Sequence, residues 1–175
     1  MGNIAGKELD NTIKQMKRNK APGPDRVISG LYKWLGMDAR GILREILNEC
    51  WEDEEVPKVL LEAHDASVYK TWDTQHFANY RPISLLNGAY KILAAIIQTI
   101  ISSKIDQVIQ KTQYGFRANR STSQALYVAR RLQYLAEQSG QGMIMCFLDW
   151  ENAFDKVDQT RMLEALERLN IQEKK

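Results

Sequence analysis

The chain has few of the residues that build disulfide scaffolds or thiolate and imidazole metal sites. It contains 2 cysteines and 2 histidines in 175 residues. Cys50 and Cys146 lie far apart, and neither they nor His64 and His76 have the spacing of a zinc site or a disulfide framework. This scarcity excludes a disulfide-rich secreted domain, and we expect an intracellular protein of a reducing compartment.

Long uninterrupted apolar runs are also missing. The longest apolar stretch, residues 89–101, is interrupted by Lys91, Gln98 and Thr99, and it is too short and polar to cross a bilayer. The first six residues resemble neither a secretory signal nor a transit peptide, and Gly6 stands where N-myristoylation needs Ser or Thr. The sequence therefore predicts no membrane span.

A strong net charge is absent too, because two opposed blocks nearly cancel to a formal +2. Residues 38–65 hold three basic and nine acidic side chains. Residues 81–136 hold eight Lys or Arg against the single acid Asp106. A basic block of this kind favours an anionic partner, most often nucleic acid, although a solvated basic face is the simpler alternative.

Hydrophobic periodicity predicts a helix-rich α/β (α+β) fold with a small sheet, in one domain. With 44% hydrophobic residues, the chain can bury one core. Apolar residues recur at helical spacing in six segments: 7–19, 31–35, 41–51, 90–109, 122–136 and 160–169. Residues 63–70 have strand character, and Pro82 favours an edge strand or extended loop around it.

Residues 143–148 form an apolar run of strand length, which predicts a buried strand or, less simply, a short buried helix. Asp149 stands where this strand would end, and Phe154 and Asp155 follow. An acid at the end of a buried strand is a common way to present a metal ligand. The alternative is an acid that caps the following turn or helix.

Four segments carry unusual residue combinations in a fixed order. They are Lys20–Asp25 (KAPGPD), Asn79–Asn87 (NYRPISLLN), Gln113–Thr122 (QYGFRANRST) and Phe147–Asp155 (FLDWENAFD). Together they resemble the landmarks of reverse transcriptases of the non-LTR retrotransposon and group II intron type. The resemblance covers most of residues 7–171 and implies the fingers and the first part of the palm of such an enzyme.

The resemblance assigns a role to each matching palm residue. Asp149 matches a carboxylate that binds the Mg²⁺ ions of nucleotidyl transfer, and the backbone carbonyl of Trp150 also faces metal in relatives. Hard cations choose oxygen ligands, and two metals clamp the attacking and leaving oxygens. Phe154 matches the bulky residue that closes off the sugar 2′ position. Without the resemblance, Phe154 is simply a core residue.

The fingers residues follow in the same way. Arg81 and, less securely, Lys70 match the cations that hold the incoming triphosphate, for which an arginine is suited by its bidentate contacts. The loop that carries Gly115, Phe116, Arg117 and Arg120 lies near the template in relatives, where aromatic rings and arginines stack and pair with phosphates. Arg81 could instead anchor its own loop to an acid.

The sequence after Asp149 contains no adjacent pair of aspartates, which this family places on a later palm hairpin. One carboxylate cannot hold two Mg²⁺ ions, so we expect no stably bound metal and no polymerisation by this chain alone. We predict one partial reverse transcriptase domain, with residues 7–136 fingers-like and 137–175 the start of the palm.

Three functions stay open at this point. The chain is a fragment of a reverse transcriptase, or a domesticated non-catalytic subunit of a larger protein or ribonucleoprotein assembly, or an independent nucleic-acid-binding module. The expected partners are an RNA template and, for a subunit, proteins that cover the palm face.

Overall fold

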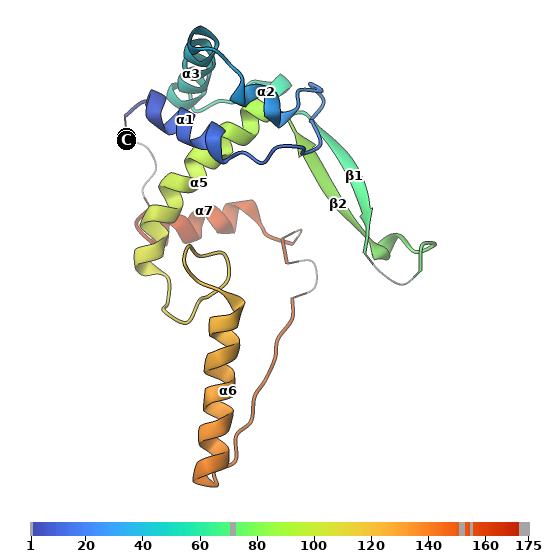
Figure 1. Cartoon of the computed structure of the whole chain (residues 1–175), viewed down its shortest axis with the longest axis vertical. Coiled ribbons are helices and arrows are strands. Elements are labelled where there is room, and N and C mark those ends of the chain that lie inside the picture. The colour runs from blue at the N-terminus through green and yellow to red at the C-terminus, as the bar shows by residue number, and fades with distance from the viewer. Residues whose placement is uncertain (1, 71–72, 151–152, 155, 172–175) are drawn as a thin grey trace. The chain divides into compact units, whose positions relative to one another are not determined.

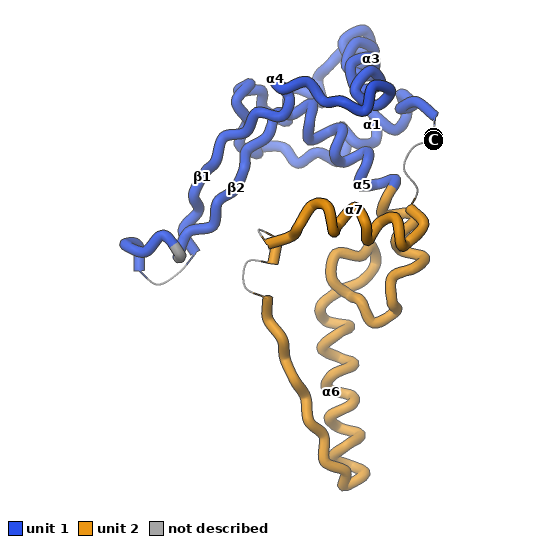
Figure 2. Tube along the Cα trace, turned by 180° about the vertical axis from the view of Figure 1, so that it is seen from behind, with its two compact units in different colours: residues 1–100 blue, residues 101–175 orange. Residues whose placement is uncertain are grey.

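The computed structural model describes residues 2–70, 73–150, 153–154 and 156–171. Two compact units divide the chain, residues 1–100 and 101–175 (Figure 2). Both are rich in helix, and the described strands form one two-stranded sheet (Figure 1). The predicted helix-rich fold with a small sheet is therefore confirmed.

The first unit is a helical core that carries a long hairpin. Its elements in chain order are α1 (Gly6–Gln15), α2 (Ser29–Lys33), α3 (Met37–Glu52), α4 (Lys58–Leu61), β1 (Ala63–Tyr69), a 3₁₀ turn (Phe77–Asn79), β2 (Tyr80–Leu86) and the first part of α5 (Gly88–Val108). Figure 1 shows β1 and β2 extending away from the helices of this unit as a paired ribbon. The hairpin therefore depends on its base for its direction.

The core of this unit is built by one face from each of three helices. Leu9 and Ile13 of α1 lie one turn apart, as do Leu43 and Leu47 of α3, which is the spacing of an amphipathic helix. Helix α5 contributes Ile92 and other buried side chains to the same cluster. Burial of these side chains supplies most of the favourable free energy of folding in this unit.

An antiparallel ladder joins β1 and β2 over seven residue pairs, from Ala63 opposite Leu86 to Tyr69 opposite Tyr80. Pro82 lies in β2 opposite Ser67, so a strand predicted to lie at a sheet edge does so. The rings of Tyr69 and Tyr80 lie 5.6 Å apart on one face. Such cross-strand aromatic pairs fix the register of a two-stranded ribbon.

The second unit holds the end of α5, a turn-rich loop, α6 (Thr122–Ser139) and α7 (Gln159–Arg168). Helix α6 ends at Gly140, whose φ of 68° makes a left-handed cap. Helix α7 is capped by Asp158, whose side chain accepts a 3.0 Å hydrogen bond from the Arg161 N–H.

The predicted buried strand at residues 143–148 is wrong. Residues 141–150 are extended and exposed, and they join no ladder in the described part of the chain. Ile144 is 98% exposed and Cys146 is exposed as well. A strand needs a neighbour for its backbone groups, and β1 and β2 use each other for that purpose. Asp149 consequently does not end a buried strand.

No helix among the described residues combines the length and apolarity that a bilayer crossing requires.

The central role of α3 can be tested at Leu47, which is fully buried, whereas its neighbour Ile46 is exposed. We expect Leu47→Ala to lower the free energy of unfolding by about 3 kcal/mol, because it removes apolar contacts and leaves a cavity. Ile46→Ala, the matched control, should cost less than about 1 kcal/mol. Urea unfolding followed by circular dichroism measures both, and equal losses would contradict the assigned core.

Candidate nucleotide and nucleic-acid site

The hairpin brings the two predicted triphosphate-binding cations together. Arg81 lies opposite Val68 in the ladder, and the Lys70 N–H donates a 2.8 Å hydrogen bond to the Asn79 carbonyl just beyond β1. Residues opposite one another, and residues two apart, share a face of an antiparallel ribbon. Lys70 and Arg81 are therefore diagonal neighbours on one face, and both side chains are exposed.

The opposite face of the hairpin is fixed by its own contacts. Ser84 donates a 2.6 Å hydrogen bond to the Asp65 carboxylate across the ladder, and the Tyr69–Tyr80 pair lies on the same face. Asp65 is thus held away from the two cations. The cationic face carries no acid at the ladder positions next to Arg81, since Val68 and Ile83 flank it.

In the second unit, Arg117 holds the loop that follows α5. Its Nε donates to the Asp106 carboxylate at 2.7 Å, and its other nitrogens donate to the carbonyls of Asp106, Gln110 and Gln113. Its side chain is only 8% exposed. The guanidinium thereby satisfies carbonyls at and beyond the end of α5, where a cation is also favoured by the helix dipole.

The anchored loop presents an aromatic side chain to solvent. Phe116 has a φ of 57°, a left-handed conformation that a bulky residue rarely adopts, and is 96% exposed. Its ring meets the exposed ring of Phe154 edge to face, with centroids 5.7 Å apart and planes at 87°. The structure thus joins two predicted site residues 38 positions apart.

Arg120, three residues after Arg117, has its guanidinium carbon 5.9 Å from the centre of the Tyr114 ring. This cation–π contact keeps the guanidinium close to the loop while its side chain stays exposed. Gly115 lies between the two aromatics of the loop, and a Cβ there would meet only the end of the Gln113 side chain, at 3.7 Å. The loop therefore combines two aromatic rings with one available arginine.

The palm residues do not form a metal site in the described part of the chain. Asp149 and Trp150 lie in the exposed extended segment, and Asp155 lies outside the described residues. Magnesium takes about six oxygen ligands. Among the residues that the structure describes, no group of three or more His, Cys, Asp or Glu side chains could hold a metal ion. The donor set described here does not fit a bound Mg²⁺ ion.

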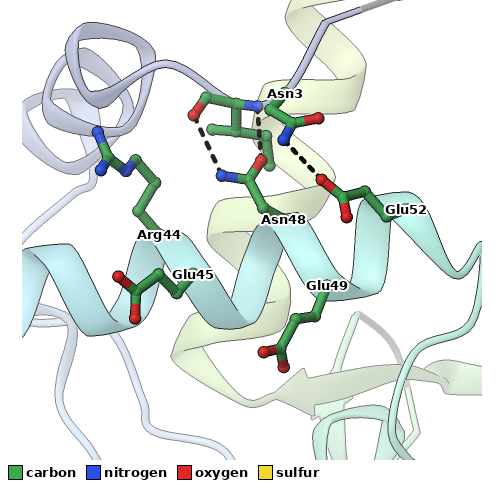
Figure 3. Close-up of a pocket in the computed structure, with 7 residues that line it drawn as sticks. Asn3, Arg44, Glu45, Asn48, Glu49 and Glu52 are labelled. Carbon is green, nitrogen blue, oxygen red and sulfur yellow. Dashed lines mark hydrogen bonds between the residues drawn. The ribbon is translucent and has the colours of Figure 1, made fainter.

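An open pocket of about 450 Å³ lies beside α3 (Figure 3), and none of the predicted site residues lines it. Asn48 bridges the backbone of Ile4 there, accepting from its N–H at 2.6 Å and donating to its carbonyl at 3.4 Å. Asn3 donates to Glu52 at 2.6 Å. These hydrogen bonds fasten the start of the chain to α3.

Comparisons with known proteins show the family of this chain. The family described as reverse transcriptase (RNA-dependent DNA polymerase) matches residues 70–174, more than half of the chain. The chain belongs to the reverse transcriptase family.

Relatives of this reverse transcriptase chain come from mobile elements. It is 28% identical over 160 residues, 91% of its length, to the transposon TX1 uncharacterized 149 kDa protein of Xenopus laevis. It is also 28% identical over 165 residues, 93% of its length, to the RNA-directed DNA polymerase from mobile element jockey of Drosophila melanogaster. The chain spans only 12% and 18% of these two relatives.

Sequence reasoning missed two features of this reverse transcriptase chain. The first is the engagement of Arg117 by Asp106, which lies eleven residues earlier in a different element. The second is the contact of the Lys20–Asp25 loop with Asn87, across 62 residues. Asp106 is the single acid among the many basic residues of this region. That imbalance is the one signal in the sequence that could have indicated the contact between Arg117 and Asp106.

The Arg117 anchor makes a prediction about pH. The hydrogen bond from Arg117, more than any other cause, holds the pKa of the Asp106 carboxyl below its ordinary value. Since the folded pKa is depressed, the ion pair contributes stability above the ordinary pKa of an aspartate, and that contribution is lost as pH falls through the lowered value. We expect Arg117→Ala to return the Asp106 pKa toward normal.

Carboxyl carbon NMR titration measures this pKa directly. Arg130→Ala, a change of the same kind on α6, should leave the Asp106 titration where it is. An Asp106 midpoint unaffected by Arg117→Ala would show that the anchor does not form in solution.

Proposed function

We propose that this chain is the nucleotide- and template-holding part of an RNA-directed DNA polymerase. One observation carries the proposal: the register of the hairpin sets Lys70 and Arg81 side by side on an exposed face. A triphosphate carries several adjacent negative charges, and two neighbouring cations match it. Arg81 supplies a planar fork for two phosphate oxygens, and Lys70 supplies a mobile point charge.

The exposed aromatics of the second unit suit the nucleic acid. Phe116 presents an exposed ring, and such rings stack on bases without regard to sequence. Arg120 is the phosphate partner that this loop offers, whereas Arg117 acts through the loop that it holds. Phe154, in contact with Phe116, takes the place of the residue that excludes a sugar 2′ hydroxyl.

DNA synthesis itself is proposed for the longer protein or assembly and not for this chain alone. Reverse transcriptases use divalent metals, which would supply the charge that stabilises the attacking and leaving oxygens. Asp149 is the residue that would contribute a ligand, through its carboxylate, with the carbonyl of Trp150 beside it. These two residues make an incomplete donor set, so we propose that the isolated chain holds no Mg²⁺ stably.

A second candidate, a subunit that has lost catalysis, is favoured by the exposed apolar segment 143–150. Phe147, Leu148 and Trp150 are each about 80% exposed, and Ile144 is 98% exposed. Contiguous exposed apolar residues mark a surface that another protein covers. Both candidates therefore place this segment inside a larger protein or complex, and they differ in whether that complex synthesises DNA.

The triphosphate proposal is tested at Arg81. We expect Arg81→Ala to weaken deoxynucleoside triphosphate binding about tenfold or more, since a charge-assisted hydrogen bond contributes about 1.5–3 kcal/mol. The triphosphate affinity of Arg81→Lys should lie between those of the unaltered chain and Arg81→Ala, because lysine keeps the positive charge and loses the planar guanidinium fork. Isothermal titration calorimetry with the purified chain provides the affinities.

Arg130→Ala is the control for a general loss of positive charge, because Arg130 lies on α6. Equal losses at Arg81 and Arg130 would mean that the triphosphate binds by net charge alone. No binding by the unaltered chain would refute the proposed function.

The nucleic-acid proposal is tested at Phe116. We expect Phe116→Ala to weaken single-stranded RNA binding about tenfold, because stacking on one base contributes roughly 1–3 kcal/mol. The slope of affinity against salt should be unchanged, whereas Arg120→Ala should reduce that slope by about one phosphate contact. Fluorescence anisotropy at several salt concentrations measures both.

Phe77→Ala is the matched control, because Phe77 is an equally exposed phenylalanine of the first unit. A flat salt response of the unaltered chain, or an equal effect of the Phe77 change, would exclude the assigned surface.

A further inference from the structure

The Lys20–Asp25 loop, the first of the four segments that carry the family resemblance, meets the base of the hairpin. Four residues make this contact, and we call them the root junction: Gly23, Asp25, Asn87 and Gly88. Asn87 is 2% exposed and follows β2 directly. Its Oδ1 accepts a 3.1 Å hydrogen bond from the Asp25 N–H, and its Nδ2 donates to the Val59 carbonyl at 2.6 Å.

These bonds tie both ends of the hairpin to one side chain. Val59 belongs to α4, which leads into β1, and Asn87 stands at the exit of β2. The amide oxygen and nitrogen of this buried side chain both have a hydrogen-bond partner. Removing one partner is costly, because the buried group that remains loses its hydrogen bond and cannot replace it with one to water. Asn87 therefore joins the entry and exit of the hairpin to each other and to the loop.

The Asp25 carboxylate completes the junction at the start of α5. Its Oδ1 accepts from the Val27 N–H at 3.0 Å, and its Oδ2 accepts from the Gly88 N–H at 3.4 Å. The Asn87 carbonyl accepts from the Lys91 N–H at 3.1 Å, so Asn87 occupies the cap position of the helix. The Asn87 side chain does not cap the helix, because it bonds to Asp25 and Val59. The Asp25 carboxylate lies at the N-terminus of α5 instead, where a negative charge is favourable.

Two glycines allow the backbones to approach this closely. A Cβ at Gly23 would lie 2.5 Å from the carbonyl carbon and oxygen of Leu86, and one at Gly88 would lie 2.2 Å from the Tyr32 ring. Burial raises the pKa of the Tyr32 hydroxyl, and the charge of Asp25 raises it further, which fits their proximity. The junction therefore combines a close contact between main chains at Gly23 with a close contact between main chain and the Tyr32 ring at Gly88.

The hairpin acts as a lever on this junction. Arg81 lies six positions before Asn87 along an extended chain, a distance of about 20 Å at 3.3 Å per residue. A rotation of about 10° at the base would move the cationic face by roughly 3.5 Å. Misplacement by as little as about 1 Å can reduce a rate by a large factor when groups must meet a substrate in register.

We propose that Asp25 and Asn87 are positioning residues, which set the direction of the hairpin and so the place at which Lys70 and Arg81 hold a triphosphate. The proposal rests on the proposed function for the identity of the ligand. It assigns the Pro-Gly-Pro-Asp loop a role without contact to substrate. The loop acts through Asn87, Gly88 and the strand between them and Arg81.

The test measures hairpin direction and triphosphate affinity in the same variants of the full chain. Spin labels at Ser67→Cys on β1 and Glu45→Cys on α3, in a Cys146→Ser background, report a distance within the first unit; the native Cys50 is buried. We expect a narrow distance distribution for the parent. Asp25→Ala and Asn87→Ala should broaden it and weaken triphosphate binding about tenfold.

Asp25→Asn is the milder variant, because it keeps an acceptor oxygen and loses the charge, and it should show an intermediate effect on both readouts. Asp158→Ala is the matched control, since Asp158 caps α7 in the second unit and is not part of the root junction. Circular dichroism confirms that each variant keeps its helices, and if Asp25→Ala or Asn87→Ala unfolds, Asp25→Asn decides the result.

An unchanged distance distribution in folded Asp25 and Asn87 variants would overturn the proposal. So would a broadened distribution with unchanged triphosphate affinity. If the parent chain binds no triphosphate, the proposed function fails by itself, and the distance distribution still decides whether the junction sets the hairpin direction.

Discussion

The arrangement of the first unit depends on the buried amide of Asn87. Its side chain has one hydrogen bond to the Asp25 backbone and one to the Val59 carbonyl, and helix α5, one of the three helices that build the core, starts beside it. The hydrophobic cluster of α1, α3 and α5 stabilises the unit, but it does not set the direction in which the β1–β2 hairpin extends. The directional groups are the amide, the Asp25 carboxylate and the two glycines that permit close approach. Burial and polar contact therefore have separate roles in this unit.

The second unit uses the same division on a smaller scale. The Arg117 guanidinium donates to the Asp106 carboxylate and to carbonyls near the end of α5, and these hydrogen bonds hold the loop. Phe116 of the same loop has a left-handed backbone conformation, and its exposed ring contacts Phe154. In both units a charged or amide side chain holds a loop, and the groups that face solvent lie a few residues away. The residues suited to bind ligand are thus distinct from those that place them.

Local patterns were sufficient for much of this fold. The apolar spacing of residues 90–109 and 122–136 predicted α5 and α6, and Pro82 indicated that its strand lies at a sheet edge. Long-range partners could not be predicted in this way. An isolated sequence does not tell which acid takes Arg117 or that Asp25 meets Asn87 across 62 residues. The apolar run 143–148 has strand composition, yet a strand also requires a partner, and composition contains no information about one.

The central claim is that this member of the reverse transcriptase family holds nucleotide and template but leaves DNA synthesis to a longer protein or assembly. A primer-extension assay of the purified chain tests it most directly, with an RNA template, a DNA primer, deoxynucleoside triphosphates and Mg²⁺. The account predicts no extended primer under conditions in which calorimetry detects bound triphosphate. Any template-dependent product would contradict it.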